Sequence, residues 1–101
     1  MIAYNPHPYQ EKAIGLLCSQ PGAGLLLDPG MGKTSITLAA YTVMREAGAV
    51  RAMLVIAPRR PMTLTWPREV EKWTDFAGLR VSIVRGTPAQ RVKALAVEAD
   101  I

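Results

Sequence analysis

The sequence predicts an α/β fold in which an open, mostly parallel β-sheet is flanked by helices within one domain of 101 residues. Three observations support this fold class. Short apolar runs alternate with segments of helical period, prolines and glycines separate the two kinds of segment, and the resulting order is α-β-α-β-α-β-α. Strands that alternate with helices pair in parallel through right-handed crossovers.

The first part of the chain predicts a helix, a strand, a glycine loop and a second helix. Residues 8–19 begin with a proline and carry apolar residues at helical spacing. Residues 24–27 form an apolar run of strand length, which the sequence Asp-Pro-Gly-Met-Gly interrupts. From Thr34 onward apolar residues share one helix face, and Gly48 is the expected C-terminal cap.

The middle of the chain predicts a buried strand followed by a helix. Residues 52–57 are apolar throughout, which suits a strand that is covered on both faces of a parallel sheet. Residues 62–76 have a helical pattern, and Pro67 either starts this helix or kinks it. Trp66 and Trp73 lie two turns apart on the same face, which is more typical of core packing than of base stacking.

The last part of the chain predicts a third short strand and a final helix. The strand covers residues 81–84 and ends at Arg85-Gly86. Thr87 is the expected N-cap and Pro88 the first residue of a helix that continues to about Val97.

The composition is that of a soluble globular domain with a modest core. Twelve Lys and Arg residues against eight Asp and Glu residues give a net charge of +4, which is compatible with a polyanionic partner. The only cysteine, Cys18, cannot form an internal disulfide, so we expect a reducing, cytoplasmic location. No apolar run approaches the roughly 20 residues that span a bilayer, so we expect no membrane role.

The loop Asp-Pro-Gly-Met-Gly-Lys-Thr, residues 28–34, has the features that phosphate binding requires. Its glycines allow backbone N–H groups to surround an anion, and the helix N-terminus that follows favours negative charge. Lys33 supplies a cation, and Thr34 could offer its hydroxyl to Mg²⁺. The general P-loop pattern also requires glycine at position 27, where this chain has leucine. The competing interpretation is an ordinary glycine turn that caps a helix.

Four stretches of the sequence occur at the spacing of a known family. They are Tyr9-Gln10, Leu26 to Thr34, Val55 to Pro58, and the block Trp66-x-x-Glu69-x-x-Lys72-Trp73. Together they resemble the first motor lobe of Swi/Snf-type ATPases, which are superfamily 2 helicase-like proteins, and phage and bacterial members are the nearest match. The resemblance implies a partial RecA-like P-loop lobe, in which residues 1–101 would be the N-terminal portion of a truncated lobe.

The resemblance also implies roles for individual residues. Gln10 would read the edge of adenine, Lys33 would bind the β- and γ-phosphates of ATP, and Thr34 would bind Mg²⁺. The remaining nucleotide contacts would come from Gly30, Met31, Gly32 and Ser35. An amide can pair with adenine, so the assignment of Gln10 is chemically sensible, although a helical glutamine often lies only on a solvated face.

Arg59 and Arg60 follow the second predicted strand, at the position where the family touches the DNA backbone. Arginine forks suit phosphates. The resemblance implies that the partner is DNA, expected to be double-stranded. The alternative is that both arginines serve only to keep the protein soluble.

The sequence has no adjacent Asp-Glu pair, which P-loop motors use to hold Mg²⁺ and orient water. We therefore expect the 101 residues to bind ATP without hydrolysing it, while the rest of the motor would be encoded beyond residue 101. Incomplete coverage of the apolar strands would favour self-association.

The favoured hypothesis is the ATP-binding portion of a helicase-like DNA-dependent ATPase or translocase. The alternative is a stand-alone P-loop module that binds nucleotide or DNA without turnover. A nucleotide kinase or transporter ATPase is disfavoured, because either would carry the missing glycine and would lack the tryptophan block.

Overall fold

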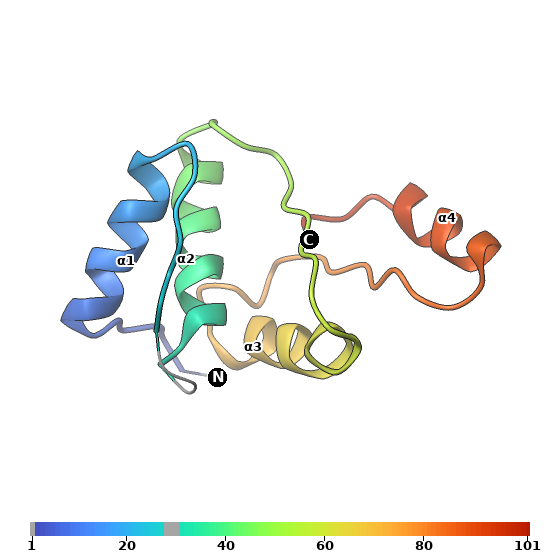
Figure 1. Ribbon diagram of the computed structural model, residues 1–101, viewed down its shortest axis with the longest axis horizontal. Coiled ribbons are helices and arrows are strands. Elements are labelled where there is room, and N and C mark those ends of the chain that lie inside the picture. Colours follow the sequence, from blue (N-terminus) through green and yellow to red (C-terminus); the bar gives the residue numbers. More distant parts are fainter. Residues whose placement is uncertain (1, 28–30) are drawn as a thin grey trace.

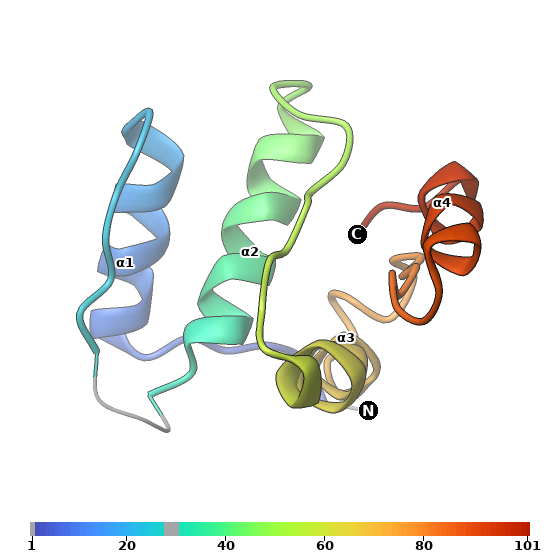
Figure 2. The ribbon, with the colours of Figure 1, turned by 45° about the vertical axis from the view of Figure 1, so that its right-hand side comes forward.

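The computed structural model of the protein describes residues 2–27 and 31–101, and its regular elements are helices (Figure 1). In chain order they are α1 (Pro8–Ser19), α2 (Lys33–Glu46), the π-helix η1 (Pro61–Thr65), α3 (Trp66–Lys72) and α4 (Pro88–Ala96). Figures 1 and 2 both show α1 and α2 side by side, with α3 across one end of α2 and α4 at the far end of the molecule. The described helices are too short or too polar to cross a bilayer.

The predicted sheet is wrong for the described residues, because none of them forms a β-strand. The three predicted strands, residues 24–27, 52–57 and 81–84, are irregular. A strand needs a partner for its backbone N–H and C=O groups, and these segments do not hydrogen bond to one another through the described backbone. Local apolar runs were therefore insufficient evidence for a sheet.

The last two residues bridge two of these irregular segments. The N–H of Met53 donates to the carbonyl of Asp100 at 2.9 Å, and the N–H of Ser82 donates to the carbonyl of Ile101 at 2.8 Å. An apolar cavity of about 240 Å³ lies between residues 53–57 and 81–84. Asp100 and Ile101 thus hydrogen bond to both segments.

Three of the predicted helices, α1, α2 and α4, are confirmed. α1 has the predicted bounds, and the backbone N–H of His7 donates to the side chain of Gln10 at 2.8 Å at its start. α2 ends in a Schellman motif, in which Gly48 has φ of 76° and its N–H donates to the carbonyl of Arg45. α4 has Thr87 as its N-cap, as predicted, and Thr87 and Gln90 bond each other reciprocally.

The predicted helix over residues 62–76 is shorter and divided. η1 runs directly into α3, and the N–H of Trp66 donates five residues back to the carbonyl of Pro61. Pro67 has no N–H, so the carbonyl of Thr63 cannot receive the usual α-helical hydrogen bond. This missing donor is consistent with a π-turn immediately before α3.

The core lies where α2 meets α3. Its buried cluster consists of Leu38, Ala39, Val70 and Phe76. Trp66 and Trp73 are partly buried and pack against this cluster, which confirms the core interpretation of both side chains. Tyr4 also packs there, with its ring 5.2 Å from the ring of Trp73 in an edge-to-face arrangement. The N-terminal segment is thereby held against the start of α2.

Candidate functional site

The glycine loop ends in a conformation that only glycine adopts easily. Gly32 has φ of 78°, and α2 begins at the next residue, Lys33. A Cβ atom at position 32 would lie 2.5 Å from Nε2 of Gln10 and 3.1 Å from Oγ of Ser35. The carbonyl of Gly32 accepts from the N–H of Ile36 at 2.9 Å and from the hydroxyl of Ser35 at 2.9 Å. Gly30 lies outside the described residues.

Gln10 joins α1 to the glycine loop. Its side-chain nitrogen donates to the carbonyl of Met31 at 3.2 Å, and the hydroxyl of Tyr9 donates to the same carbonyl at 2.9 Å. Gln10 is only 7% exposed, so it does not lie on a solvated helix face. Tyr9 and Gln10 therefore anchor the carbonyl of Met31 to α1.

The loop, α1 and α3 surround a cavity of about 530 Å³. Its lining brings together five of the predicted nucleotide residues, namely Gln10, Gly32, Lys33, Thr34 and Ser35. Lys33 is exposed, Thr34 is half-buried and Ser35 is buried. The volume falls in the range of roughly 300–1,000 Å³ that is usual for small-molecule sites.

Tyr4 is a site residue that the sequence analysis missed. Its hydroxyl is buried on the cavity lining beside the Ser35 side chain, and it makes no hydrogen bond of standard geometry with the described residues. Burial raises the pKa of this phenol, so it is neutral and can donate a hydrogen bond. A buried hydroxyl without a partner is costly, and a ligand that accepts its hydrogen bond would remove that cost. Nothing near Tyr4 in the sequence signals this contact, because its aromatic neighbours, Trp73 and Phe76, lie about 70 residues away in the chain.

The tryptophan block also contributes to the cavity. Nε1 of Trp73 donates to Glu69 at 2.8 Å, and both residues line the cavity with Lys72. Nζ of Lys72 lies 4.6 Å from the centre of the Trp73 ring, which is a cation–π distance. The spacing of the block could have revealed the first contact, because residues four apart share a helix face.

Arg59 and Arg60 are both exposed, but they line different hollows. Arg59 lies with Arg85 and Arg91, whereas Arg60 lies with Arg68. The sequence analysis missed Arg68 and Arg91. The described residues contain no group of three or more acidic, histidine or cysteine side chains that could hold a metal ion by themselves.

Comparison with known proteins supports the family resemblance. The model of the SNF2-related domain matches residues 9–101. Protein p41 of Acyrthosiphon pisum secondary endosymbiont phage 1 is 33% identical over 96 residues, which are 94% of this chain and 21% of the relative. The DNA excision repair protein ERCC-6-like of Bos taurus is 35% identical over 85 residues, which are 79% of this chain and 7% of the relative.

A third relative is the chromodomain-helicase-DNA-binding protein 3 homolog of Caenorhabditis elegans. It is 37% identical over 78 residues, which are 71% of this chain and 4% of the relative. No solved structure matches. The chain thus spans between 4% and 21% of the length of these relatives. The family match covers almost the whole chain, which therefore belongs to the SNF2-related family.

Proposed function

We propose that this chain is the ATP-binding portion of a helicase-like DNA-dependent ATPase or translocase. The observation that supports this function best is the left-handed Gly32 at the start of α2, because it opens the first turn of the helix toward the cavity that Lys33 and Thr34 line. A helix N-terminus beside a lysine in a cavity of this size suits an anionic small molecule.

The phosphates would bind at the first turn of α2. The N–H groups of Lys33, Thr34 and Ser35 have no partner within the helix, so they can donate to phosphate oxygens together with those of Gly30, Met31 and Gly32. Lys33 would neutralise the β- and γ-phosphates. The hydroxyl of Ser35 already donates to the carbonyl of Gly32, so we propose that this side chain stabilises the conformation of Gly32.

Adenine would bind near Gln10. The Gln10 side chain uses one N–H toward Met31 and one oxygen lone pair toward His7, which leaves one donor and one acceptor free. A free donor beside a free acceptor is the pair that matches the adenine edge. Tyr9 and His7, whose rings lie parallel 6.0 Å apart, line the same end of the cavity.

Mg²⁺ would be held by the Thr34 hydroxyl and the nucleotide phosphates, since this ion usually binds through few protein ligands. When bound, it neutralises charge on the phosphates. The 101 residues contain no adjacent Asp-Glu pair, so we propose binding without turnover by this chain alone. A stand-alone module that binds nucleotide or DNA without turnover is the second candidate.

DNA is the proposed macromolecular partner. Two of the relatives carry DNA in their names, and Arg59 and Arg60 are exposed cations just before η1. Contacts from these side chains to backbone phosphates would be salt-sensitive and independent of sequence.

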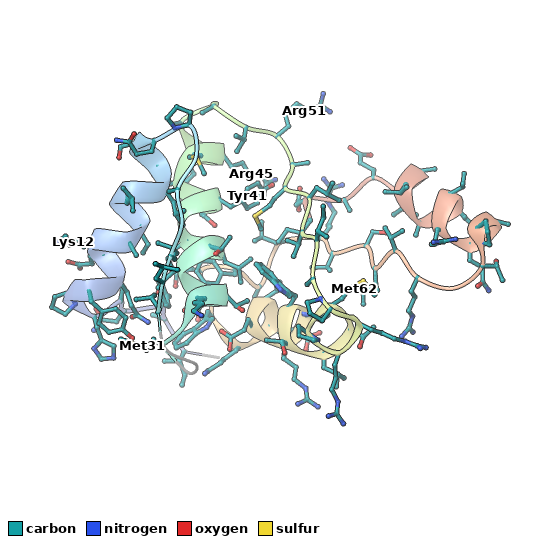
Figure 3. All side chains as sticks on the ribbon, in the orientation of Figure 1. Lys12, Met31, Tyr41, Arg45, Arg51 and Met62 are labelled. Atoms are coloured by element: carbon teal, nitrogen blue, oxygen red, sulfur yellow. The ribbon has the colours of Figure 1, made fainter. Side chains whose placement is uncertain are left out.

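Calorimetry with ATP and Mg²⁺ tests the nucleotide site. We expect Lys33→Ala to weaken binding at least tenfold, because hydrogen bonds to charged groups contribute about 1.5–3 kcal/mol. Lys12→Ala is the matched control, since Lys12 is an exposed lysine on α1 that does not line the cavity (Figure 3). Equal affinity of wild type and Lys33→Ala would mean that the glycine loop is not the nucleotide site.

A phosphate-release assay with DNA present separates the two candidate functions. Extended protein that carries an Asp-Glu pair should turn over ATP if the chain is part of a motor. A binding module would show no turnover in any form, with nucleotide affinity unchanged.

A further inference from the structure

A second large hollow, of about 800 Å³, lies between η1 and the start of α4. We call it the arginine basin, and its lining residues are Arg59, Met62, Ile83, Val84, Arg85, Gly86, Gln90 and Arg91. The three arginines are exposed and come from three separate parts of the chain, whereas the three large apolar residues are half-buried. The basin therefore has a charged rim above an apolar floor.

The described residues do not neutralise the positive charge of the basin. No carboxylate lines the basin, and Arg59, Arg85 and Arg91 form no ion pair with the described residues. Other arginines of this chain do pair, since Arg45 and Arg80 both contact Asp100 at 3.2 Å. Three arginines around one hollow repel one another unless an anion lies between them.

The loop that carries Arg85 has a fixed conformation. Gly86 has φ of 92°, and a side chain there would collide with the side chain of Gln90. The N–H of Thr87 donates to Gln90 at 2.9 Å, and the N–H of Arg91 donates to the carbonyl of Thr87 at 2.9 Å. Arg85 and Arg91 thus flank one capped helix start, so little backbone ordering would be needed for them to bind together.

We propose that the arginine basin binds the sugar–phosphate backbone of duplex DNA, with Arg85 and Arg91 each contacting a phosphate. This inference rests on the proposed DNA partner. It extends the surface that would contact DNA beyond Arg59 and Arg60. A further hollow is lined by Arg60 and Arg68 together with the carboxylate of Glu69, so exposed arginines continue beyond the basin. No aromatic side chain lines the basin, which disfavours single strands, because their bases usually stack on aromatic rings.

Fluorescence anisotropy of a labelled duplex, measured over a range of salt concentrations, tests the proposal. The variant Arg85→Gln/Arg91→Gln should reduce the slope of log affinity against log salt by about 1.8, since each lost phosphate contact removes about 0.9. The matched control is Lys12→Gln/Arg51→Gln, which removes the same charge. Figure 3 shows Lys12 and Arg51 far from Met62 of the basin, and both are exposed. The control should leave the slope within about 0.3 of wild type.

The outcomes separate this proposal from the proposed function. If wild type binds duplex and Arg60→Gln/Arg68→Gln, outside the basin, lowers the slope while the Arg85/Arg91 variant does not, the basin is not a DNA site although the DNA function stands. Absence of duplex binding by wild type would overturn both. Displacement of the duplex by inorganic phosphate or polyglutamate at the same charge concentration would identify a general anion site and overturn the basin as a DNA site. Circular dichroism should show unchanged helix content in every variant.

Discussion

The carboxylate of Asp100 is buried and bonded on several sides. It accepts from the backbone N–H of Arg80 at 2.7 Å and from the Arg80 guanidinium at 3.2 Å, and it pairs with Arg45 at 3.2 Å. The hydrogen bond from the Arg80 side chain, followed by that from its backbone, holds the pKa of Asp100 below its usual value. A lowered pKa stabilises the fold above the ordinary aspartate value near 4, and this contribution disappears as the pH falls through the folded-state pKa.

We expect Asp100→Asn to lower the free energy of unfolding by about 2 kcal/mol at pH 7, because the charge-assisted bonds to a buried carboxylate are lost. Urea unfolding at pH 7 and at about pH 3 measures the effect, and the difference from wild type should shrink at the lower pH. Glu98→Gln is the control, because Glu98 is 89% exposed and lies 3.9 Å from Arg80. It should change stability by less than about 0.5 kcal/mol. An equal loss in both variants would contradict the role of Asp100.

At the scale of one element, the start of α2 depends on a single glycine. Gly32→Ala places a side chain at φ of 78° and against Gln10, so we expect a loss of at least about 1–2 kcal/mol and weaker ATP binding. Gly15→Ala is the matched control within α1, where an added Cβ meets no atom within 4 Å. It should stabilise the protein by about 0.5–1 kcal/mol. Urea unfolding and calorimetry check both variants, and a Gly32→Ala protein as stable as wild type would refute the conformational argument.

The helices were predictable from the sequence because their signals are local. Pro8 marks the start of α1, the cap at Thr87 marks α4, and Gly48 marks the end of α2. The strands were not predictable, because an apolar run such as 52–57 has the composition of a strand whether or not a partner is available. Its one backbone partner, Asp100, lies far away in the chain.

Some residues of the candidate site were likewise predictable from the sequence, and others were not. The sequence placed Gln10 and Lys33 at one site, and the structure brings both to one cavity because α1 packs against α2. Tyr4, Glu69 and Lys72 were missed as cavity residues, since their positions depend on how α3 and the N-terminal segment pack. Arg59 and Arg60 line different hollows, because adjacent residues on a helical turn point in different directions, and their role in DNA binding stays a prediction.

At the scale of the whole molecule, the 52–57 segment leaves apolar surface exposed. Exposure alternates along it: Leu54 and Ile56 are 75% and 92% exposed, while Met53, Val55 and Ala57 are half-buried. Residues 54–57 make no backbone hydrogen bond to the described residues. Exposed apolar side chains beside free backbone groups are a template for another chain.

We therefore expect concentration-dependent self-association through this segment, measured by light scattering across a dilution series. The variant Leu54→Lys/Ile56→Lys should shift the protein toward monomer, because each substitution places a charge where an apolar contact would form. The control, Val92→Lys/Val97→Lys, adds the same charge at exposed apolar positions, 67% and 55% exposed, in and just after α4. If wild type is monomeric at every concentration, the exposed segment does not drive association. If both variants dissociate equally, added charge rather than the 52–57 surface governs it.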